Sequence, residues 1–254
     1  MTFEKTVAVM GGCGHVGLPL AIALAEAGFQ TKIYDIDQHA CEVVRSGKMP
    51  FYEEKAEEVL QKVLDSGALT VSNDPKVLSE TRFVICVIGT PVDEFLNPTV
   101  HRFFAAIEKT REHMRDGQLL ILRSTLFPET SQRVQKFFDD RGPKIDVAFC
   151  PERVAQGKGY LEVRTLPQII SGFSERGLAA ARFLFEQLGV DILEVEPLEA
   201  ELIKLFNNVW RYVTFAVANQ FFTIANDYGI DYYHIHHGLT HNYPRGADIP
   251  RHSH

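Results

Sequence analysis

Along most of the chain, short apolar runs alternate with segments in which apolar residues recur every three or four positions. The runs are typical of parallel strands covered on both faces, and the second pattern is typical of helices with one buried face. We predict strands at 7–10, 30–34, 69–71, 82–88, 118–122, 146–149, 168–171 and 190–194, and helices at 18–28, 38–46, 53–66, 100–115 and 175–188. We also predict a small α-helix that begins at Asp74-Pro75 and another helix between the strands at 118–122 and 146–149. Because strands and helices alternate, the pattern predicts an α/β fold with a doubly wound, mostly parallel sheet.

The pattern changes after Pro197. Residues 198–228 contain neither glycine nor proline, and apolar residues recur there at helical spacing until Gly229. Such a segment predicts one helix longer than most helices of globular domains. Its aromatic residues fall on several faces, as expected of an interface. They include Trp210, Phe215, Phe221 and Phe222. We therefore predict two domains, 1–196 and 197–254, and a homodimer through the 198–228 helix, at the start of a helical dimerisation domain.

The first predicted strand runs into a glycine-rich turn that opens the first helix. Gly12, Gly14 and Gly17 fit the pattern G-x-G-x-x-G of dinucleotide sites. In such a turn the first glycine permits the bend, the second lets a pyrophosphate approach the backbone, and the third lets the helix pack against the strand. The pyrophosphate then lies on the free N–H groups at the positive end of the helix. The turn therefore predicts a Rossmann-type dinucleotide site.

An acidic residue follows the second predicted strand. Asp35 lies about 20 residues after the turn, where a carboxylate accepts hydrogen bonds from the hydroxyls of an adenosine ribose. The same carboxylate repels the 2′-phosphate of NADP, so the sequence predicts NAD as the cofactor. The alternative is an ordinary strand-to-helix turn in another kind of α/β protein.

Composition narrows the class of protein. The chain is 45% hydrophobic and 23% charged, as in soluble globular proteins. Its net charge of −7 and the lack of a basic run argue against nucleic acid or an anionic membrane as partner. No apolar run approaches the roughly 18 residues of a membrane helix, and Glu4 stands where a signal peptide needs cations, so we expect a cytoplasmic protein. The four cysteines lack metal-ligand spacing, so we expect free thiols and no bound metal.

Three polar residues share one face of the predicted long helix. Lys204, Asn208 and Arg211 stand at positions i, i+4 and i+7. An ammonium and an amide in one stripe can stabilise negative charge that develops on an oxygen atom. The alternative is a polar face that meets only solvent.

A series of motifs, in order up to Pro250, resembles the UDP-glucose/GDP-mannose dehydrogenase family. The motifs are Gly12-Cys13-Gly14-His15-Val16-Gly17-Leu18-Pro19, Gly89-Thr90-Pro91, Ser124-Thr125, Cys150-Pro151-Glu152-Arg153-Val154-Ala155-Gln156-Gly157-Lys158, Glu201-Leu202-Ile203-Lys204-Leu205-Phe206-Asn207-Asn208 and Tyr243-Pro244-Arg245. Enzymes of this family oxidise the C6 alcohol of a nucleotide-linked hexose to a carboxylate and reduce two NAD. The resemblance implies a UDP-hexose type of substrate and a place in polysaccharide biosynthesis.

The resemblance also implies a role for each motif. The residues that bind the cofactor would be Gly12, Cys13, Gly14, His15, Val16, Gly17, Asp35, Thr90, Pro91, Ser124 and Thr125. The residues that bind the substrate would be Glu152, Arg153, Val154, Lys204, Asn208 and Arg211. The catalytic residues would be Lys204, Asn208, Glu152 and Thr125, with Lys204 and Asn208 stabilising the oxyanion at C6.

Three departures from the family pattern change the expectations. His15 stands where many members have tyrosine. Gln156 stands where UDP-glucose dehydrogenases carry a glutamate that acts as base in thioester hydrolysis; either Glu152 with a water replaces it, or that step is impaired. The family's nucleophilic cysteine and its C-terminal nucleotide-binding domain would follow His254. We therefore expect these residues alone to bind NAD without completing turnover.

Two other interpretations stay open. The 3-hydroxyacid dehydrogenases also join a Rossmann domain to a long helix with the motif Lys-x-x-Asn-Asn, as at residues 204–208, but they lack the Pro-Glu-Arg-Val loop. The other alternative is a non-catalytic module that binds NAD or dimerises. The motifs do not identify the sugar.

Overall fold

The computed structural model describes residues 3–89 and 100–251. Two compact units make up the chain, Met1–Leu202 and Ile203–His254. The first unit contains all the strands of the described residues, and the second contains most of one long helix and the short elements after it.

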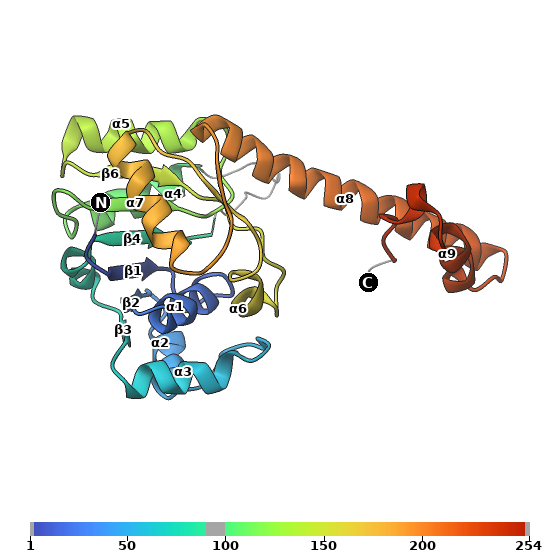
Figure 1. The fold of residues 1–254 in the computed structure, drawn as a ribbon, viewed down its shortest axis with the longest axis horizontal. Helices are drawn as coiled ribbons and strands as arrows, with labels where there is room; N and C mark the ends of the chain where they lie inside the picture. The colour runs from blue at the N-terminus through green and yellow to red at the C-terminus, as the bar shows by residue number, and fades with distance from the viewer. Residues whose placement is uncertain (1–2, 90–99, 252–254) are drawn as a thin grey trace. The chain divides into compact units, whose positions relative to one another are not determined.

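A six-stranded sheet forms the centre of the first unit (Figure 1). Its strands are β1 (Thr6–Met10), β2 (Gln30–Tyr34), β3 (Leu69–Ser72), β4 (Phe83–Cys86), β5 (Leu119–Leu122) and β6 (Asp146–Phe149). The strands lie in the order β3-β2-β1-β4-β5-β6, and every neighbouring pair is parallel. The chain reverses its direction of winding between β1 and β4. Ligands bind at this switch point in doubly wound folds, and the predicted fold class is confirmed.

Strands β1, β4, β5 and β6 are buried on both faces, which explains their continuous apolar runs. The side chains of β4 and β5 are wholly inaccessible, and in β1 Val9 lies level with Ile33 on one side and Ile85 on the other. Parallel strands reach this state because crossover helices cover both faces. A strand that is buried on both faces needs apolar residues at successive positions rather than at alternate ones, as the sequence shows.

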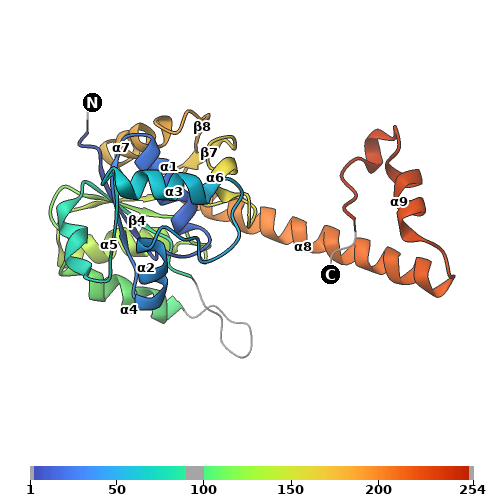
Figure 2. The same cartoon turned by 90° about the horizontal axis from the view of Figure 1, so that it is seen from below.

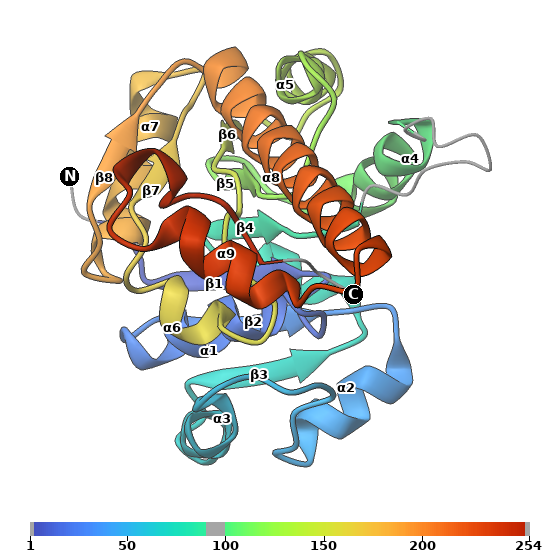
Figure 3. The same cartoon turned by 90° about the vertical axis from the view of Figure 1, so that its right-hand side faces the viewer.

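The helices occupy opposite sides of the sheet. They are α1 (Gly17–Glu26), α2 (Gln38–Arg45), α3 (Ala56–Asp65), η1 (Pro75–Glu80), α4 (Val100–Arg111), α5 (Thr130–Arg141), α6 (Gly159–Glu162) and α7 (Glu175–Glu186). Figures 2 and 3 show α4 and α5 on one side, with α1 and α7 on the other. Right-handed crossovers that leave the centre in opposite directions place their helices on opposite faces. The carboxyl ends of β1, β4 and β5 therefore meet at one edge.

Three details differ from the sequence-based expectations. The segments near 168–171 and 190–194 pair with each other as β7 (Gln168–Ile170) and β8 (Ile192–Glu194), in a small parallel sheet of their own. An antiparallel bridge between Ala148 and Gly172 joins this pair to β6. Helix α3 begins later than predicted because Lys55 takes a left-handed conformation, with φ at 62°, which interrupts the helix. The segment after Asp74 is a 3₁₀ helix.

The long helix that the uninterrupted segment of the sequence predicts is confirmed as α8 (Pro197–Asp227). It begins in the first unit and continues into the second. A second helix, α9 (Tyr232–Thr240), and the turn η2 (Pro244–Gly246) follow it and were not predicted. Tyr232 is buried and packs edge-on against Phe222, which ties α9 to α8. None of the helices in the described ranges meets the length and apolarity that crossing a membrane requires.

The start of α8 is fixed inside the first unit by Glu201. Its carboxylate is buried and accepts hydrogen bonds from the backbone N–H groups of Glu129, at 2.6 Å, and Ser131, at 2.8 Å. These groups lie at the N-terminus of α5, whose own N-cap residue, Glu129, makes no side-chain cap. Free N–H groups at a helix start need an acceptor. Glu201 therefore caps α5 from a distant helix.

Candidate cofactor and substrate site

The glycine-rich turn closes tightly between β1, β2 and α1. Gly11 carries the left-handed conformation, with φ at 80°, so this residue rather than Gly12 makes the bend. A Cβ on Gly12 would lie 2.7 Å from the carbonyl oxygen of Val9, and one on Gly17 would lie 2.6 Å from the Cα of Gly12. Such distances are shorter than real contacts of a Cβ. Gly12 and Gly17 are therefore required by packing within the turn.

Gly14 is different from the other glycines of the turn. A Cβ at this position would meet only the carbonyl oxygen of Gly11, at 3.7 Å, within the described part of the chain. The fold itself therefore does not require glycine there. A missing Cβ without a steric need inside the protein is what close approach of a pyrophosphate to the backbone demands, so the turn fits NAD.

Asp35 joins the end of β2 to this turn. One carboxylate oxygen accepts a hydrogen bond from the N–H of Cys13, at 2.9 Å, and the other accepts one from the N–H of Asp37, at 3.1 Å. A carboxylate has about four acceptor positions, so ribose hydroxyls can still bind. Asp35 therefore holds the turn in place and can still accept hydrogen bonds from the hydroxyls of an adenosine ribose.

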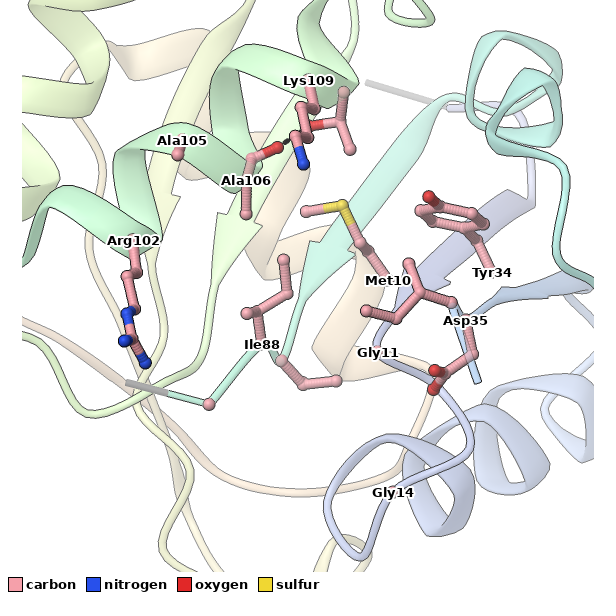
Figure 4. A pocket seen from close by; sticks show the side chains of 14 residues that line it. Met10, Gly11, Gly14, Tyr34, Asp35, Ile88, Arg102, Ala105, Ala106 and Lys109 are labelled. Carbon is pink, nitrogen blue, oxygen red and sulfur yellow. Dashed lines mark hydrogen bonds between the residues drawn. The ribbon is translucent and has the colours of Figure 1, made fainter. Parts of the chain in front are cut away.

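A pocket of about 610 Å³ opens at the switch point between β1 and β4. Figure 4 shows Asp35 near the turn at Gly14, and Arg102 and Lys109 on α4 across the pocket. The other lining residues are Met10, Gly11, Tyr34, Ile36, Val87, Ile88, Gly89, Ala105, Ala106 and Thr110. The volume lies within the usual range for sites of small ligands and cofactors.

Helix α4 contributes to this pocket, although no motif in the sequence had indicated it. Arg102 and Lys109 stand seven residues apart, and so share a face of α4 (Val100–Arg111) with the small residues Ala105 and Ala106. Ile36, beside Asp35, is 85% exposed. It provides an apolar surface on which the adenine base of a dinucleotide could pack. A helix that follows β4 lies at the switch point by topology, so the signal was present in the strand order rather than in any motif.

His15 stacks on an aromatic residue from another segment. Its ring lies 4.0 Å from that of Phe51, measured between centroids, with 18° between the ring planes. Phe51 precedes Tyr52 and Glu53 in the loop before α3. The stack therefore connects the turn to the loop before α3.

The end of β5 supplies Ser124 and Thr125. The hydroxyl of Ser124 donates a hydrogen bond to the carbonyl oxygen of Ile88, just after β4, so the two strand ends are linked. Thr125 is half-buried. Thr90 and Pro91 lie outside the described residues, and their contact with the cofactor stays a prediction.

Glu152 is held by a network at the ends of β5 and β6. One of its oxygens pairs with the guanidinium of Arg123, and the other accepts hydrogen bonds from the N–H groups of Arg153, at 2.6 Å, and Val154, at 2.9 Å. Burial alone would raise the pKa of Glu152, but the charge of Arg123 and these hydrogen bonds outweigh it and lower the pKa below its usual value. Arg123 was not singled out in the sequence.

The other end of the same loop is held by Glu53. Its carboxylate accepts a hydrogen bond from the N–H of Tyr160, at 2.8 Å, and the N–H of Glu54 donates to the carbonyl oxygen of Gly157, at 3.1 Å. Burial raises the pKa of Glu53, although the backbone donors and His15 oppose this shift. The loop between Glu152 and Tyr160 is therefore fixed at both ends.

Lys204, Asn208 and Arg211 lie along α8 in the second unit. Lys204 and Asn208 are half-buried, and Arg211 is exposed with its guanidinium 5.8 Å from the ring centroid of Tyr212. Their common face on one uninterrupted helix agrees with the predicted spacing. Their placement against the cofactor and the Glu152 loop stays a prediction.

All four cysteines are buried, and burial raises the pKa of each thiol. Cys150, the one nearest to the Glu152 motif in sequence, has a pKa of about 12. The thiol is the inactive form of a cysteine nucleophile, so Cys150 is unsuited to capture an aldehyde. Among the residues described, no group of three or more histidine, cysteine, aspartate or glutamate side chains is arranged to hold a metal ion.

Two family models match the chain. Residues 5–189 match the NAD-binding domain of the UDP-glucose/GDP-mannose dehydrogenase family, and residues 198–252 match the central domain of that family. NAD as the cofactor, predicted from the turn and Asp35, is thereby confirmed.

Individual relatives agree with these matches. The UDP-N-acetyl-D-mannosamine dehydrogenase of Pyrococcus horikoshii is 30% identical over 233 residues, which cover 89% of this chain and 55% of the relative. A solved structure described as UDP-D-ManNAc dehydrogenase from the same organism has a TM-score of 0.88 at 29% identity, over 97% of this chain and 59% of that one. GDP-mannose dehydrogenase from Pseudomonas aeruginosa shares the fold, with a TM-score of 0.86 at 20% identity over 95% and 58% of the two chains. The chain spans about half the length of the curated relatives it matches.

Proposed function

The chain belongs to the UDP-glucose/GDP-mannose dehydrogenase family, and on this premise we propose that it supplies the NAD-binding domain (1–196) and the start of the central helical domain (197–254) of a nucleotide-sugar 6-dehydrogenase. The proposed reaction is oxidation of the C6 alcohol of a UDP-linked hexose to the uronate. The observation that carries the proposal is the Gly14 position, open to a pyrophosphate, in a chain that keeps the family's later motifs.

NAD, when bound, would supply the acceptor for the hydride of the sugar carbon in such a reaction. The residues of this chain bind and orient the two reactants. The backbone N–H groups of the turn before α1 meet the pyrophosphate, Asp35 meets the adenosine ribose, and the ends of β4 and β5 lie on the nicotinamide side. This division follows from the switch point, because the adenosine half of NAD would lie over β2 and the nicotinamide half would lie over β4 and β5.

The long helix α8 carries the groups proposed to act on the C6 oxygen. Lys204 and Asn208 lie one turn apart on α8. An ammonium and an amide that donate to an alkoxide stabilise the charge that develops as hydride leaves. Arg211, a further turn along, would contact the substrate.

Support for the UDP-sugar class comes from the relatives. Those of highest similarity reported above are named as dehydrogenases of UDP-N-acetyl-D-mannosamine. We therefore place an acetamido sugar linked to UDP ahead of UDP-glucose and GDP-mannose as the substrate. The rival 3-hydroxyacid dehydrogenase activity loses support, because both family models belong to nucleotide-sugar enzymes. A non-catalytic module remains the second candidate, since no described cysteine suits nucleophilic catalysis.

The test is an NADH-formation assay with UDP-N-acetylmannosamine, UDP-glucose and GDP-mannose. The 254 residues alone should bind NADH and produce little NADH, because oxidation of an alcohol to an acid proceeds through a captured aldehyde and the buried thiols cannot capture it. A fusion of this chain to the part of the Pyrococcus horikoshii relative that the match leaves uncovered should oxidise one of the sugars with two NADH per sugar, and Lys204→Met should abolish this. Steady two-NADH turnover by the 254 residues alone would contradict the proposal and direct attention to Cys150.

A further inference from the structure

We propose that Arg123 and Glu152 form a positioning pair, which holds the loop at residues 153–158 through the buried carboxylate of Glu152. The importance of this loop for the sugar rests on the proposed function, whereas the pair and its effect on the loop do not. Glu152 is then an acceptor for backbone amides instead of a group that exchanges a proton with substrate or water. This assignment replaces the alternative, raised from the sequence, in which Glu152 with a water substitutes for the missing base at Gln156.

The burial of Arg123 shows why it needs this partner. Its side chain has no exposed surface, and its guanidinium lies 5.0 Å from the ring centroid of Phe185 on α7. One terminal nitrogen donates to the carboxylate of Glu152, and the other donates to the amide oxygen of Gln168, at 3.2 Å. A buried guanidinium without a counter-charge is strongly unfavourable. Arg123 therefore keeps Glu152 in its charged form and in one orientation.

The second oxygen of Glu152 acts on the loop. It accepts hydrogen bonds from the N–H groups of Arg153 and Val154, the first two residues after Glu152. Hydrogen bonds to an ionised carboxylate are stronger than those to a neutral acceptor. The backbone N–H of Glu152 also donates to the carbonyl oxygen of Arg123, at 3.3 Å, and this bond continues the pairing of β5 with β6 beyond their ends. The loop therefore leaves the sheet in a direction set by the pair.

The same network reaches the predicted cofactor side. Arg123 directly precedes Ser124, whose hydroxyl is bonded to the carbonyl oxygen of Ile88 at the end of β4. One buried residue thus fixes the end of β5, and through Glu152 it fixes the start of the loop after β6. The far end of that loop is held independently by Glu53 and Tyr160. Loss of the pair should therefore release the start of the loop and leave its end in place.

Proton exchange at Glu152 is opposed by the same contacts. A general base must gain a proton, and its ideal pKa lies near the working pH. The contacts of Glu152 instead hold its pKa below its usual value. Protonation would also leave Arg123 buried without a counter-charge. The Glu152 side chain is only 9% exposed, so water has little access to it.

The first experiment measures the ionisation of Glu152 directly. In the 254-residue chain labelled with ¹³C at glutamate carboxyl carbons, the signal of Glu152 is the one missing from Glu152→Gln. We expect its titration midpoint below that of an ordinary glutamate, about 4.3, and a higher midpoint in Arg123→Met. A midpoint near neutral pH in the parent would overturn the proposal. Because no substrate is used, this result is independent of whether the proposed function is right.

The second experiment separates positioning from simple stabilisation. Amide hydrogen exchange at Arg153 and Val154 should accelerate by about tenfold or more in Glu152→Gln, in which the acceptor has lost its charge. The double variant Arg123→Met with Glu152→Leu leaves no buried charge, so its melting temperature should return toward that of the parent. Exchange at Arg153 and Val154 should nevertheless stay fast, because leucine accepts no hydrogen bond.

A matched control uses an exposed ion pair. Asp140→Asn weakens the contact with Lys136, in which both side chains are more than half exposed, and should change neither stability nor exchange in the loop. If the double variant recovers its melting temperature and its loop protection together, the pair is merely structural and the proposal fails. NADH affinity measured in parallel reports the cofactor site separately, so failure of the proposed function is recognised on its own.

Discussion

At the scale of the residue, the glycines of the turn differ in whether their surroundings leave room for a Cβ atom. Gly12 and Gly17 leave no space for a Cβ, because backbone atoms lie within 2.7 Å of its position. Gly14 leaves space, and its lack of a side chain fits the proposed approach of a pyrophosphate to the backbone. The distinction separates residues that the fold requires from one that we propose for NAD binding.

A pair of variants tests this distinction. Gly17→Ala should lower the free energy of unfolding by about 1–3 kcal/mol, the usual cost of overpacking, because the methyl group meets the backbone of Gly11 and Gly12. Gly14→Ala should stay within about 0.5 kcal/mol of the parent, as for substitutions without a structural conflict. Urea unfolding of both variants is the measurement. Equal destabilisation of the two would show that Gly14 has a structural role that its surroundings do not reveal.

At this scale, spacing along the chain predicted only part of the site. Gly12, Gly14, Gly17 and Asp35 could be proposed for the cofactor site because they belong to a motif of fixed offsets, which one strand and one helix preserve in space. Arg123 was missed because its role depends on Glu152, 29 positions away, and on burial under α7. Such pairings arise from the packing of separate elements and leave no local pattern.

At the scale of the element, α5 and α8 are joined through one carboxylate. Glu201 satisfies two N–H groups of α5, whose own N-cap residue makes no cap, and it stands three residues before Lys204. The contact therefore anchors the start of the helix that carries the proposed oxyanion pair. The sequence predicted both helices, but the cap was not predictable because its acceptor lies about 70 residues from its donors.

Loss of this cap should be measurable. Glu201→Ala should lower the free energy of unfolding by about 2 kcal/mol or more, since two buried N–H groups lose their acceptor at about 1–3 kcal/mol each. Glu199→Ala is the matched control: its carboxylate is exposed and accepts one hydrogen bond, from Glu196, in the first turn of α8. Thermal unfolding compares the two. A small and equal effect of both substitutions would show that Glu201 does not anchor α8.

The sequence predicted the bounds of some elements more accurately than those of others. Strand β6 (Asp146–Phe149) matches the sequence-based range, and every one of its positions is buried, which gives a clear apolar signal. Strand β2 (Gln30–Tyr34) matches as well, although only alternate positions of it, Thr31 and Ile33, are buried. Helix α9 (Tyr232–Thr240) was missed because its histidines and tyrosines give little amphipathic contrast. The pairing of β7 with β8 in a sheet of their own depends on tertiary packing, which the apolar runs in the sequence do not specify.

At the scale of the whole molecule, α8 presents an exposed apolar stripe. The exposed fractions are 65% for Phe206, 66% for Trp210, 51% for Val213, 45% for Val217, 40% for Phe221 and 53% for Ile224. These positions recur every three or four residues, so they share one face of the helix. A continuous apolar stripe of this kind favours association, and it supports the proposed homodimer through residues 198–228.

The stripe gives a direct prediction about assembly. The chain should be a dimer in light scattering at tens of micromolar, the range expected for an interface with a micromolar or lower Kd. Trp210→Glu should be monomeric, because it places a charge in the centre of the stripe. Tyr212→Glu alters an equally exposed aromatic residue, 69% accessible, that lies off the stripe, and should remain a dimer. A monomeric parent would contradict the proposal.

The central claim is that the pocket at the β1–β4 switch point binds NAD through the open Gly14 turn and Asp35. Calorimetric titration of the 254-residue chain with NADH and NADPH tests it most directly. The parent should bind one NADH per chain and bind NADPH at least about tenfold more weakly, because Asp35 faces the 2′-phosphate. Gly14→Ala should remain folded and lose NADH affinity, and Asp35→Ala should narrow the difference between the two cofactors. Absence of saturable NADH binding, or equal affinity of the parent for NADPH, would contradict the account.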